Sequence, residues 1–241
     1  MANNKVERAI IMAAGKGDRM RPLTNEVPKP MVKVNGTRMI DTVIKGLLNN
    51  KITEIYVVVG YMKEKFYELR ETYPEIQFIE NPYFDVCNNI SSLYVAREHI
   101  ENAIILDGDQ VIYNDEVLKK DFEKSGYNAV WTDCETNEWL MQVEEDSVTS
   151  CSRTGGKGGW QLYSVSRWSK EDAEKLKRYV EIEFIDKENR DIYWDDVAMF
   201  LHFDEFDLGI QKMQSGDVKE IDSLEELVDI DKNYKEYLMK E

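Results

Sequence analysis

The sequence predicts an α/β protein whose mostly parallel sheet is flanked by helices. Over the first 110 residues, short apolar runs alternate with amphipathic helical patterns, and this alternation is typical of strand–helix–strand units with right-handed crossovers. After about residue 125, extended segments follow one another with turns between them, which indicates a smaller β-rich part and a mixed sheet. The length of 241 residues fits a single domain, 1–241, with halves at 1–125 and 126–241.

The expected elements of the first half follow from hydrophobic periodicity. The run at 8–14 is apolar and ends in a glycine-rich segment, as a buried parallel strand does. From Met39 to Leu48, apolar residues recur at i, i+1, i+4, i+5, i+8 and i+9, which predicts a helix. The same criteria predict strands at 54–60, 76–80 and 103–106 and helices at 63–73 and 91–98.

The second half is expected to contain strands at 128–131, 140–143 and 161–165 and helices at 169–179, 204–214 and 224–240. The first of these helices begins with Ser169-Lys-Glu-Asp, a sequence similar to a capping box. The last two flank a short extended segment, 218–222. The glycine-rich bend at Gly155–Gly159 is interpreted as a flexible hairpin rather than a second phosphate loop, because it precedes a strand.

Composition and charge argue against several classes of protein. Asp and Glu outnumber Lys and Arg by 47 to 31, and the net charge of −16 argues against a nucleic-acid-binding protein. The hydrophobic fraction of 42 % is sufficient for a core, and no apolar run is long enough for membrane insertion. The N-terminus lacks the pattern of a signal peptide, and the three cysteines are unclustered. We therefore expect free thiols and a cytoplasmic location.

The most informative segment, 12–31, begins inside the first expected strand. Ala13 and Ala14 lead into Gly15 and Gly17. A glycine lets the backbone approach a phosphate closely, and consecutive N–H groups form a concave anion site. These residues therefore predict a loop that binds a nucleotide through its phosphates.

The same stretch is locally basic within an acidic chain. Residues 16–33 include five basic and two acidic side chains, and Arg19 and Lys29 would add fixed positive charge beside a phosphate. The pattern is not a dinucleotide fingerprint or a Walker A loop, because the required spacings are absent. An ordinary glycine turn after a strand is the alternative interpretation, but it does not account for Pro28-Lys29-Pro30.

The segment resembles the signature of nucleotidyltransferases that activate sugar phosphates and alcohol phosphates. This resemblance implies a Rossmann-like nucleotidyltransferase fold and a glycine-rich loop around the triphosphate, with Arg19 and Lys29 as catalytic residues that neutralise it. Later motifs are similar to those of the bacterial-type CTP:phosphocholine cytidylyltransferases, and the similarity covers most of the chain. The matching stretches are Val58-Val-Gly-Tyr61, Asn88-Asn-Ile-Ser-Ser92-Leu-Tyr, Asp107-Gly-Asp109, Thr136-Asn-Glu-Trp139, Tyr193-Trp-Asp195 and Glu220-Ile-Asp222-Ser.

Carboxylates at two places predict a magnesium site. Asp107 ends an expected strand, at the edge where open α/β sheets bind ligands, so we expect it to contact the metal and to be catalytic. Asp109 would not contact the metal directly but would orient the groups that surround it. Glu220 and Asp222 face the same way on an extended segment, and the resemblance supports them as further Mg²⁺ ligands. The alternatives are a turn-capping Asp107 and solvated Glu220 and Asp222.

Polar residues before the helix at 91–98 are candidates for nucleotide recognition. Asn88, Asn89 and Ser92 offer donors and acceptors for a base edge or ribose, although Asn and Ser are also common helix N-caps. In the context of the family we favour recognition for Asn89 and Ser92. Tyr61 follows the second strand and is a further candidate, because that strand should lie beside the first.

Aromatic residues in polar surroundings predict the acceptor site. A quaternary ammonium is recognised by aromatic faces, often near a carboxylate, so Trp139, Tyr193 and Asp195 are interpreted as a choline-binding group, mainly on the resemblance. Asp195 could instead coordinate the metal, and the aromatic rings could simply belong to the core. The remaining tryptophans that we assign to the core are Trp131, Trp160 and Trp168.

Together these motifs predict an enzyme that converts CTP and phosphocholine to CDP-choline and pyrophosphate by in-line attack on the α-phosphate. The attacking phosphate is already anionic, so the scarcity of histidine, with two in the chain, is no obstacle. One alternative is a cytidylyltransferase for phosphoethanolamine or an aminophosphonate. Others are a sugar-1-phosphate nucleotidyltransferase and a non-catalytic nucleotide-sensing module. The oligomeric state is left open.

Overall fold

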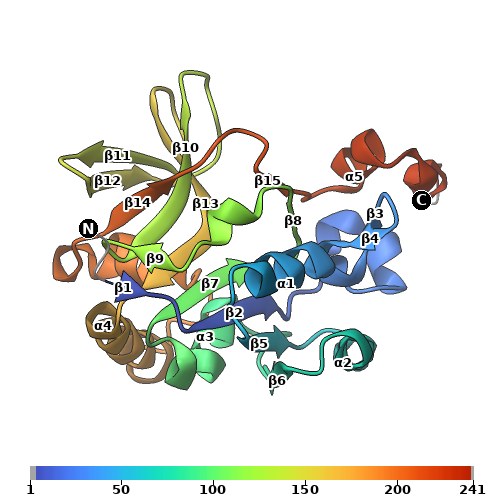
Figure 1. Cartoon of the computed structure of the whole chain (residues 1–241), viewed down its shortest axis with the longest axis horizontal. Helices are drawn as coiled ribbons and strands as arrows, with labels where there is room; N and C mark the ends of the chain where they lie inside the picture. Colours follow the sequence, from blue (N-terminus) through green and yellow to red (C-terminus); the bar gives the residue numbers. More distant parts are fainter. Residues whose placement is uncertain (1–3, 240–241) are drawn as a thin grey trace.

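The computed structural model describes residues 4–239 and has a central sheet with helices on both faces (Figure 1). Within these residues the main sheet has nine strands in the order β12-β11-β13-β7-β2-β5-β6, with β10 paired to β13 and β14 paired to β10. Its strands are β2 (Arg8–Ala13), β5 (Glu54–Val59), β6 (Ile76–Glu80), β7 (Ala103–Asp107), β10 (Gly126–Thr132), β11 (Leu140–Glu144), β12 (Ser147–Ser152), β13 (Gly159–Trp168) and β14 (Gly209–Lys212).

The remaining elements are short. The α-helices are α1 (Met39–Asn49), α2 (Leu69–Thr72), α3 (Ile90–Ala96), α4 (Lys170–Glu181) and α5 (Leu224–Ile230). Two-stranded pairs are β1 (Asn4–Lys5) with β9 (Asp121–Phe122), β3 (Lys33–Val34) with β4 (Thr37–Arg38), and β8 (Gln110–Ile112) with β15 (Val218–Glu220). Single-turn and other 3₁₀ helices lie at Asp18–Met20, Leu23–Asn25, Lys29–Met31, Lys63–Glu68, Arg97–His99, Asp115–Leu118, Phe203–Glu205 and Lys232–Met239, and π-helical segments at Ile182–Asp186 and Val197–Leu201.

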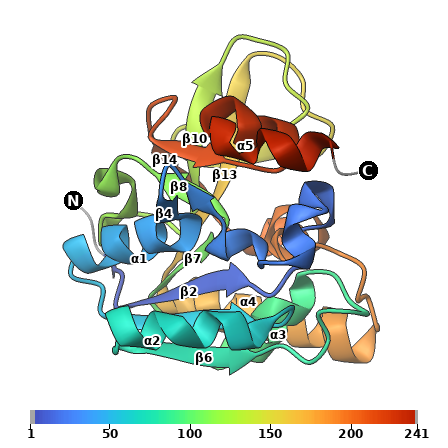
Figure 2. The ribbon, with the colours of Figure 1, turned by 90° about the vertical axis from the view of Figure 1, so that its right-hand side faces the viewer.

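The alternation of side chains along the strands explains the layers. In β2, Ile10 and Met12 belong to the apolar cluster that contains α3 and α4, whereas Ala9 and Ile11 belong to the cluster that contains α1. Successive strand residues point to opposite faces, so a continuously apolar strand must be covered on both sides. Figures 1 and 2 show helices on both faces of this part of the sheet.

The predicted fold class is confirmed. The strands β2, β5, β6 and β7 are parallel, and β13 joins β7 antiparallel, so one mixed sheet runs through both halves of the chain. The helix predicted at 63–73 is present as a 3₁₀ helix followed by α2, with Phe66 and Leu69 fully buried. The functional division of the chain at residue 125 stays a prediction.

Two predictions in the second half are wrong. The segment 204–214 is not a helix but a 3₁₀ turn followed by β14, which lies parallel to β10. Phe206 and Leu208 are buried and Ile210 packs against the same cluster, which is the period of two that a strand requires. The bend at Gly155–Gly159 does not close a hairpin, because β11 lies between the two strands that it connects.

The predicted C-terminal helix is divided into α5 and a 3₁₀ helix, and its expected last residue, Lys240, lies outside the described residues. Asp231 breaks it, because this buried residue is extended and its Oδ2 accepts a hydrogen bond of 2.9 Å from the backbone N–H of Asn35. Ile221 and Leu227 join the apolar cluster of Met20. Helix α5 is thereby held over the loop that follows β2 (Figure 2).

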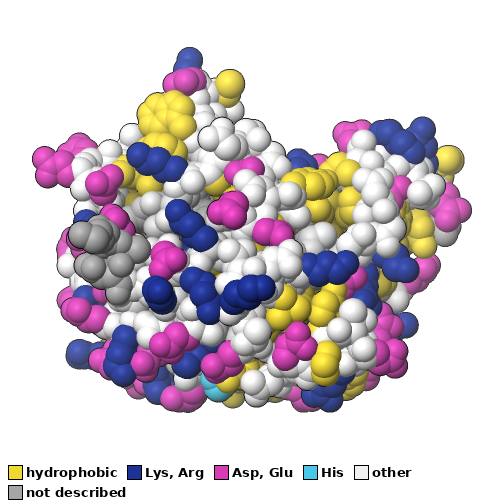
Figure 3. Space-filling view, viewed as in Figure 1, with side chains coloured by type: hydrophobic (Ala, Val, Ile, Leu, Met, Phe, Trp, Pro, Cys, Tyr) yellow, Lys and Arg dark blue, Asp and Glu magenta, His cyan; other side chains and the backbone are white. Residues whose placement is uncertain are grey.

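Other expectations have mixed outcomes. Trp168 is buried as predicted, but Trp131 is 48 % exposed near the end of β10, where Figure 3 shows hydrophobic side chains at the surface. The polar strand β12 has too little apolar patterning to be predicted. The three cysteines, all within residues 4–239, are free thiols. In the same residues, every helix is too short or too polar to cross a bilayer.

Candidate active site

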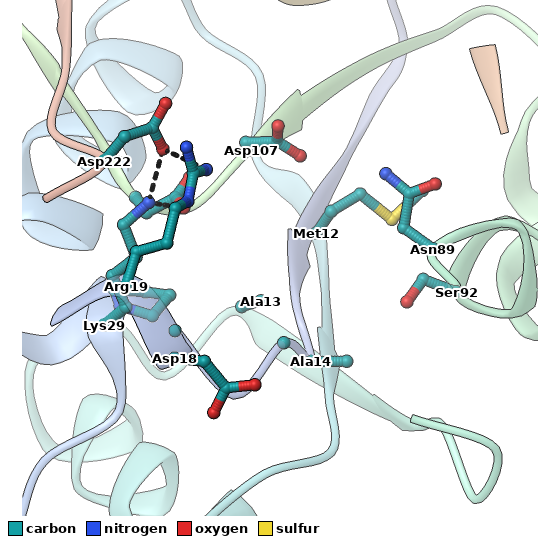
Figure 4. Close-up of a pocket in the computed structure, with 14 residues that line it drawn as sticks. Met12, Ala13, Ala14, Asp18, Arg19, Lys29, Asn89, Ser92, Asp107 and Asp222 are labelled. Carbon is teal, nitrogen blue, oxygen red and sulfur yellow. Dashed lines mark hydrogen bonds and ion pairs between the residues drawn. The ribbon is translucent and has the colours of Figure 1, made fainter. Parts of the chain in front are cut away.

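The site lies at the carboxyl ends of β2 and β7, which are neighbours in the sheet with Met12 paired to Asp107. The loop after β2 and the end of β7 line a cavity of about 320 Å³ (Figure 4). This cavity brings together ten of the predicted residues from distant parts of the sequence. They are Ala13, Ala14, Gly15, Gly17, Arg19, Lys29, Asn89, Ser92, Asp107 and Asp222.

The loop after β2 depends on a left-handed residue. Gly17 has φ of 65°, and a Cβ at this position would lie 3.0 Å from the Cβ of Lys29. The hydroxyl of Thr24 donates a hydrogen bond of 2.9 Å to the carbonyl of Gly17. This contact closes the loop on itself and places its backbone at the cavity wall.

Tyr61 supports the loop from outside. Its backbone N–H donates to the carbonyl of Ala14 over 3.1 Å, and its hydroxyl donates to the carbonyl of Thr24 over 2.9 Å. Predicted as a nucleotide contact, Tyr61 is absent from the lining of the cavity in the described structure. The structure therefore places it as a brace that connects β5 to the phosphate loop.

Lys29 is the electrostatic centre of the site. Its Nζ lies 2.7 Å from an Oδ2 of Asp109 and 2.9 Å from Oδ1 of Asp222, and the side chain is buried. Burial disfavours the charged amine, but these two carboxylates outweigh it and hold the pKa of Lys29 above its usual range. Arg19 reaches the same Oδ1 of Asp222 over 2.9 Å and is largely exposed (Figure 4).

Asp222 is held ionised by its two cationic partners. Burial would raise its pKa, but Lys29 and Arg19 lower it below the usual range. Its position is fixed by the start of α5, where Ser223 and Glu226 form a capping box. Oε2 of Glu226 also accepts a hydrogen bond of 2.6 Å from the backbone N–H of Asp222.

The pKa values of Asp107 and Glu220 are shifted upward, in the opposite direction to that of Asp222. Burial and then the charge of Asp109 raise the pKa of Asp107 to about 7. Burial and then the charge of Asp107 raise the pKa of Glu220 to about 8. Glu220 is positioned by β15, opposite Gln110 of β8, whose Nε2 donates to it over 2.9 Å. Across residues 4–239, no three His, Cys, Asp or Glu side chains are arranged to hold a metal by themselves.

The start of α3 forms another wall of the nucleotide cavity. Asn89 occupies the N-cap position but makes no capping hydrogen bond through its side chain. The Oγ atoms of Ser91 and Ser92 accept hydrogen bonds of 2.9 and 3.1 Å from Asn81, a buried residue that our sequence analysis missed. The sequence could have pointed to Asn81, because it directly follows β6 and therefore lies at the carboxyl edge of the sheet. Asn88 lines an adjoining cavity of about 340 Å³.

A second cavity, of about 260 Å³, brings together the predicted acceptor residues Trp139, Tyr193 and Asp195. The rings of Trp139 and Tyr193 are 6.1 Å apart with an interplanar angle of 85°. Phe200, which our sequence analysis missed, lies 5.1 Å from Trp139, ring to ring. Asp195 is buried, its Oδ1 has no hydrogen-bond partner among residues 4–239, and burial raises its pKa.

The two cavities meet at a shared wall. Arg19, Asn89, Asp107 and Asp222 line both. Glu220 lines the second cavity beside them. Two anionic molecules bound in these cavities would therefore meet between the cationic loop and the carboxylates, which is the geometry needed for transfer of a phosphoryl-linked group.

This fold and this site define a nucleotidyltransferase. Residues 8–132 match the model of the nucleotidyl transferase family, and the chain belongs to that family. It is 35 % identical to a 2-aminoethylphosphonate cytidylyltransferase from Lancefieldella rimae, over 97 % of this chain and 95 % of that protein. It is 32 % identical to a choline-phosphate cytidylyltransferase from Streptococcus pneumoniae, over 91 % of this chain and 94 % of that protein.

Solved structures agree with this assignment. The CTP:phosphocholine cytidylyltransferase from Streptococcus pneumoniae matches with a TM-score of 0.86 and 30 % identity, over 95 % of this chain and 99 % of that one. An inositol-1-phosphate CTP transferase from T. maritima matches with a TM-score of 0.76 at 16 % identity, over 96 % of this chain and 95 % of that one, which shows a common fold. The predicted family resemblance is confirmed.

The phosphate loop should be sensitive to substitution at Gly17. We expect Gly17→Ala to lower stability by about 1–2 kcal/mol, because alanine is strained in the left-handed region and its Cβ would crowd Lys29 and Thr24. For a chain of this size that corresponds to a fall in Tm of about 2–8 °C, measured by circular dichroism. Gly15→Ala is the matched control, because a Cβ there meets nothing within 4 Å. Equal effects of both substitutions would contradict this account.

Proposed function

We propose that this chain is a cytidylyltransferase that transfers CMP from CTP to phosphocholine and releases CDP-choline and pyrophosphate. The observation that carries this proposal is the junction of two cavities at Asp107. One contains the cationic loop with Lys29, and the other contains Trp139 beside the carboxylate of Asp195. The sequence and the solved structure from Streptococcus pneumoniae, which are named for choline phosphate and for CTP with phosphocholine, support the choice of substrates.

A second candidate acceptor is 2-aminoethylphosphonate. The relative from Lancefieldella rimae is named for this compound, and its primary ammonium would need hydrogen-bond acceptors as well as rings. The unpartnered Oδ1 of Asp195 could be such an acceptor, and Glu138 lines the same cavity. Both acceptors join a cationic nitrogen to an anionic phosphorus group, so one arrangement of charges serves either.

The chemistry follows from charge and position. The acceptor phosphate is anionic at neutral pH and attacks the α-phosphorus of CTP in line, and pyrophosphate leaves, so no general base is needed. The protein must hold two anions together and shield their repulsion. Lys29 stays protonated because its pKa is raised, and it would stabilise charge on the transferred group. Arg19 is exposed enough to reach the leaving pyrophosphate.

Magnesium fits the carboxylates at the junction. Burial and neighbouring carboxylates raise the pKa values of Asp107 and Glu220, which means that a cation beside them would stabilise their ionised forms. Carboxylate oxygens and phosphates are the ligands that Mg²⁺ prefers. We propose that Asp107, Glu220 and Asp222 hold the ion together with the nucleotide phosphates. When bound, it would neutralise phosphate charge.

The cytoplasmic location also stays a prediction.

Removal of the central cation should abolish efficient turnover. We expect Lys29→Met to lower kcat/KM by about 10²–10³, the usual cost of losing one contact to developing charge. Pyrophosphate release from CTP and phosphocholine measures this loss, and circular dichroism checks the fold. Lys33→Met is the matched control, since Lys33 is exposed on the same segment. A folded Lys29→Met variant with near-normal turnover would contradict the proposed role of Lys29.

Activity should depend on a divalent cation held by Asp107. Chelation with EDTA is expected to stop pyrophosphate release, and added MgCl₂ to restore it. Asp107→Asn should raise the Mg²⁺ concentration for half-maximal rate about tenfold or more, consistent with the typical cost of losing a metal-site partner. Asp133→Asn, at an exposed position, should leave this concentration unchanged. Full activity in EDTA would refute the metal assignment.

The aromatic pair should decide the acceptor. We expect Trp139→Ala to raise the KM for phosphocholine about 10- to 30-fold, because a desolvated cation–π contact contributes up to about 2 kcal/mol. The assay is a matrix of four nucleoside triphosphates against phosphocholine, 2-aminoethylphosphonate, phosphoethanolamine and glucose-1-phosphate. Trp131→Ala is the matched control, because Trp131 does not line the cavity among the described residues.

The same matrix separates the two candidate functions. A wild-type kcat/KM at least tenfold higher for phosphocholine than for 2-aminoethylphosphonate supports the first. The reverse ratio, with little effect of Trp139→Ala, supports the second. Pyrophosphate release only with glucose-1-phosphate would reject both.

A further inference from the structure

Two side chains of the acceptor cavity, those of Tyr193 and Asp195, are carried by a segment that has little regular structure. Residues 187–196, here called the acceptor loop, connect the π-helical segments Ile182–Asp186 and Val197–Leu201 and include Tyr193 and Asp195. No ladder of strand hydrogen bonds fixes this loop within the described structure. Its register must therefore be set by individual hydrogen bonds from neighbouring elements.

Two adjacent asparagines at the start of α3 supply such bonds. The backbone N–H of Asn88 donates to the carbonyl of Arg190 over 2.8 Å, and its Nδ2 donates to the carbonyl of Asp191 over 3.1 Å. Oδ1 of Asn89 accepts a hydrogen bond of 2.8 Å from the backbone N–H of Trp194. These contacts attach the acceptor loop to the wall of the nucleotide cavity at two points, one before and one after Tyr193 in sequence.

The two asparagines differ in what they face. Asn89 lines both the nucleotide cavity and the acceptor cavity. Asn88 lines neither of these two, but it lines the adjoining cavity together with Gly15 and Gly17 of the phosphate loop. Both ends of its amide are engaged within the chain, because Oδ1 accepts from the backbone N–H of Asn89 over 2.7 Å and Nδ2 donates to Asp191. Our sequence analysis grouped Asn88 with the nucleotide ligands.

We propose that Asn88 is a positioning residue for the acceptor, which it serves by joining the start of α3 to the acceptor loop. This inference rests on the proposed function. Oδ1 of Asn88 accepts from the backbone N–H of Asn89, whose own Oδ1 accepts from the backbone N–H of Trp194, and Nδ2 of Asn88 donates to the carbonyl of Asp191. Tyr193 and Asp195 flank Trp194 in sequence, so their positions depend on these hydrogen bonds.

The test is a comparison of Michaelis constants in the full-length enzyme. Asn88→Ala removes both side-chain hydrogen bonds, and we expect the KM for phosphocholine to rise about tenfold, as for the loss of one or two hydrogen bonds that order a loop. The KM for CTP should change less than about twofold. Asn49→Ala is the matched control, because it also loses a side-chain hydrogen bond, to Asp115, but lies outside both cavities.

A second variant separates the two ends of the amide and guards against misfolding. Asn88→Asp keeps an acceptor for the N–H of Asn89 but cannot donate to the carbonyl of Asp191. We expect the same selective rise in the KM for phosphocholine, with a Tm close to that of the wild type. A wild-type acceptor KM in this variant would overturn the proposal, as would a rise in the KM for CTP equal to the rise for the acceptor in either variant.

Failure of the inference and failure of the proposed function give different results. An active wild-type enzyme whose variants affect both substrates equally, or neither, contradicts only the role of Asn88. A folded wild-type enzyme that releases no pyrophosphate with any nucleotide and acceptor pair would overturn the proposed function and, with it, this inference.

Discussion

The buried ammonium of Lys29, held between Asp109 and Asp222, is the interaction on which the site depends. It joins three parts of the chain, namely the loop after β2, the turn after β7 and the segment that precedes α5. A buried charge is tolerated only when it is paired, and removal of one partner leaves the others uncompensated. The positions of Asp109 and Asp222, and of Arg19 through Asp222, are therefore tied to this side chain.

The same interaction explains why an acidic chain can contain a cationic site at Lys29 and Arg19. The net charge of −16 is spread over the molecule, and Figure 3 shows Asp and Glu interspersed with Lys and Arg on one face. At the site, Asp222 carries its charge because Lys29 and Arg19 are beside it, whereas Asp107 and Glu220 lie close together and have raised pKa values. Arg19, a cation, and Asp107, a carboxylate that favours a cation, thus lie at the wall that the two cavities share.

Much of the site could be predicted from sequence because its backbone has special requirements. A glycine-rich loop after a strand, a lysine between prolines and an aspartate at the end of a strand are visible without coordinates, and Gly17, Lys29 and Asp107 do meet at one cavity. The fold class was predictable for a similar reason, since strands that are buried on both faces are apolar throughout. These features are local, and the sequence records local features directly.

The remainder depends on tertiary contacts that no local pattern records. Tyr61 follows a strand at the correct edge, yet its hydroxyl turns to the carbonyl of Thr24 and supports the loop instead of lining the cavity. The segment that contains β14 has mixed periodicity, and pairing with β10 decides its conformation. Phe200 joins the aromatic group only because a π-helical segment presents it to Trp139.

Selection of the acceptor is therefore a property of the irregular part of the molecule. The strands and the phosphate loop determine where a nucleotide and a second phosphate would meet, and this arrangement suits any member of a family with many acceptors. The rings and carboxylates that could distinguish one cationic nitrogen from another are carried largely by the acceptor loop and by the turn before β11. Small changes in the hydrogen bonds that hold these segments would alter the acceptor without disturbing the chemistry, because the groups that handle the phosphates belong to different elements.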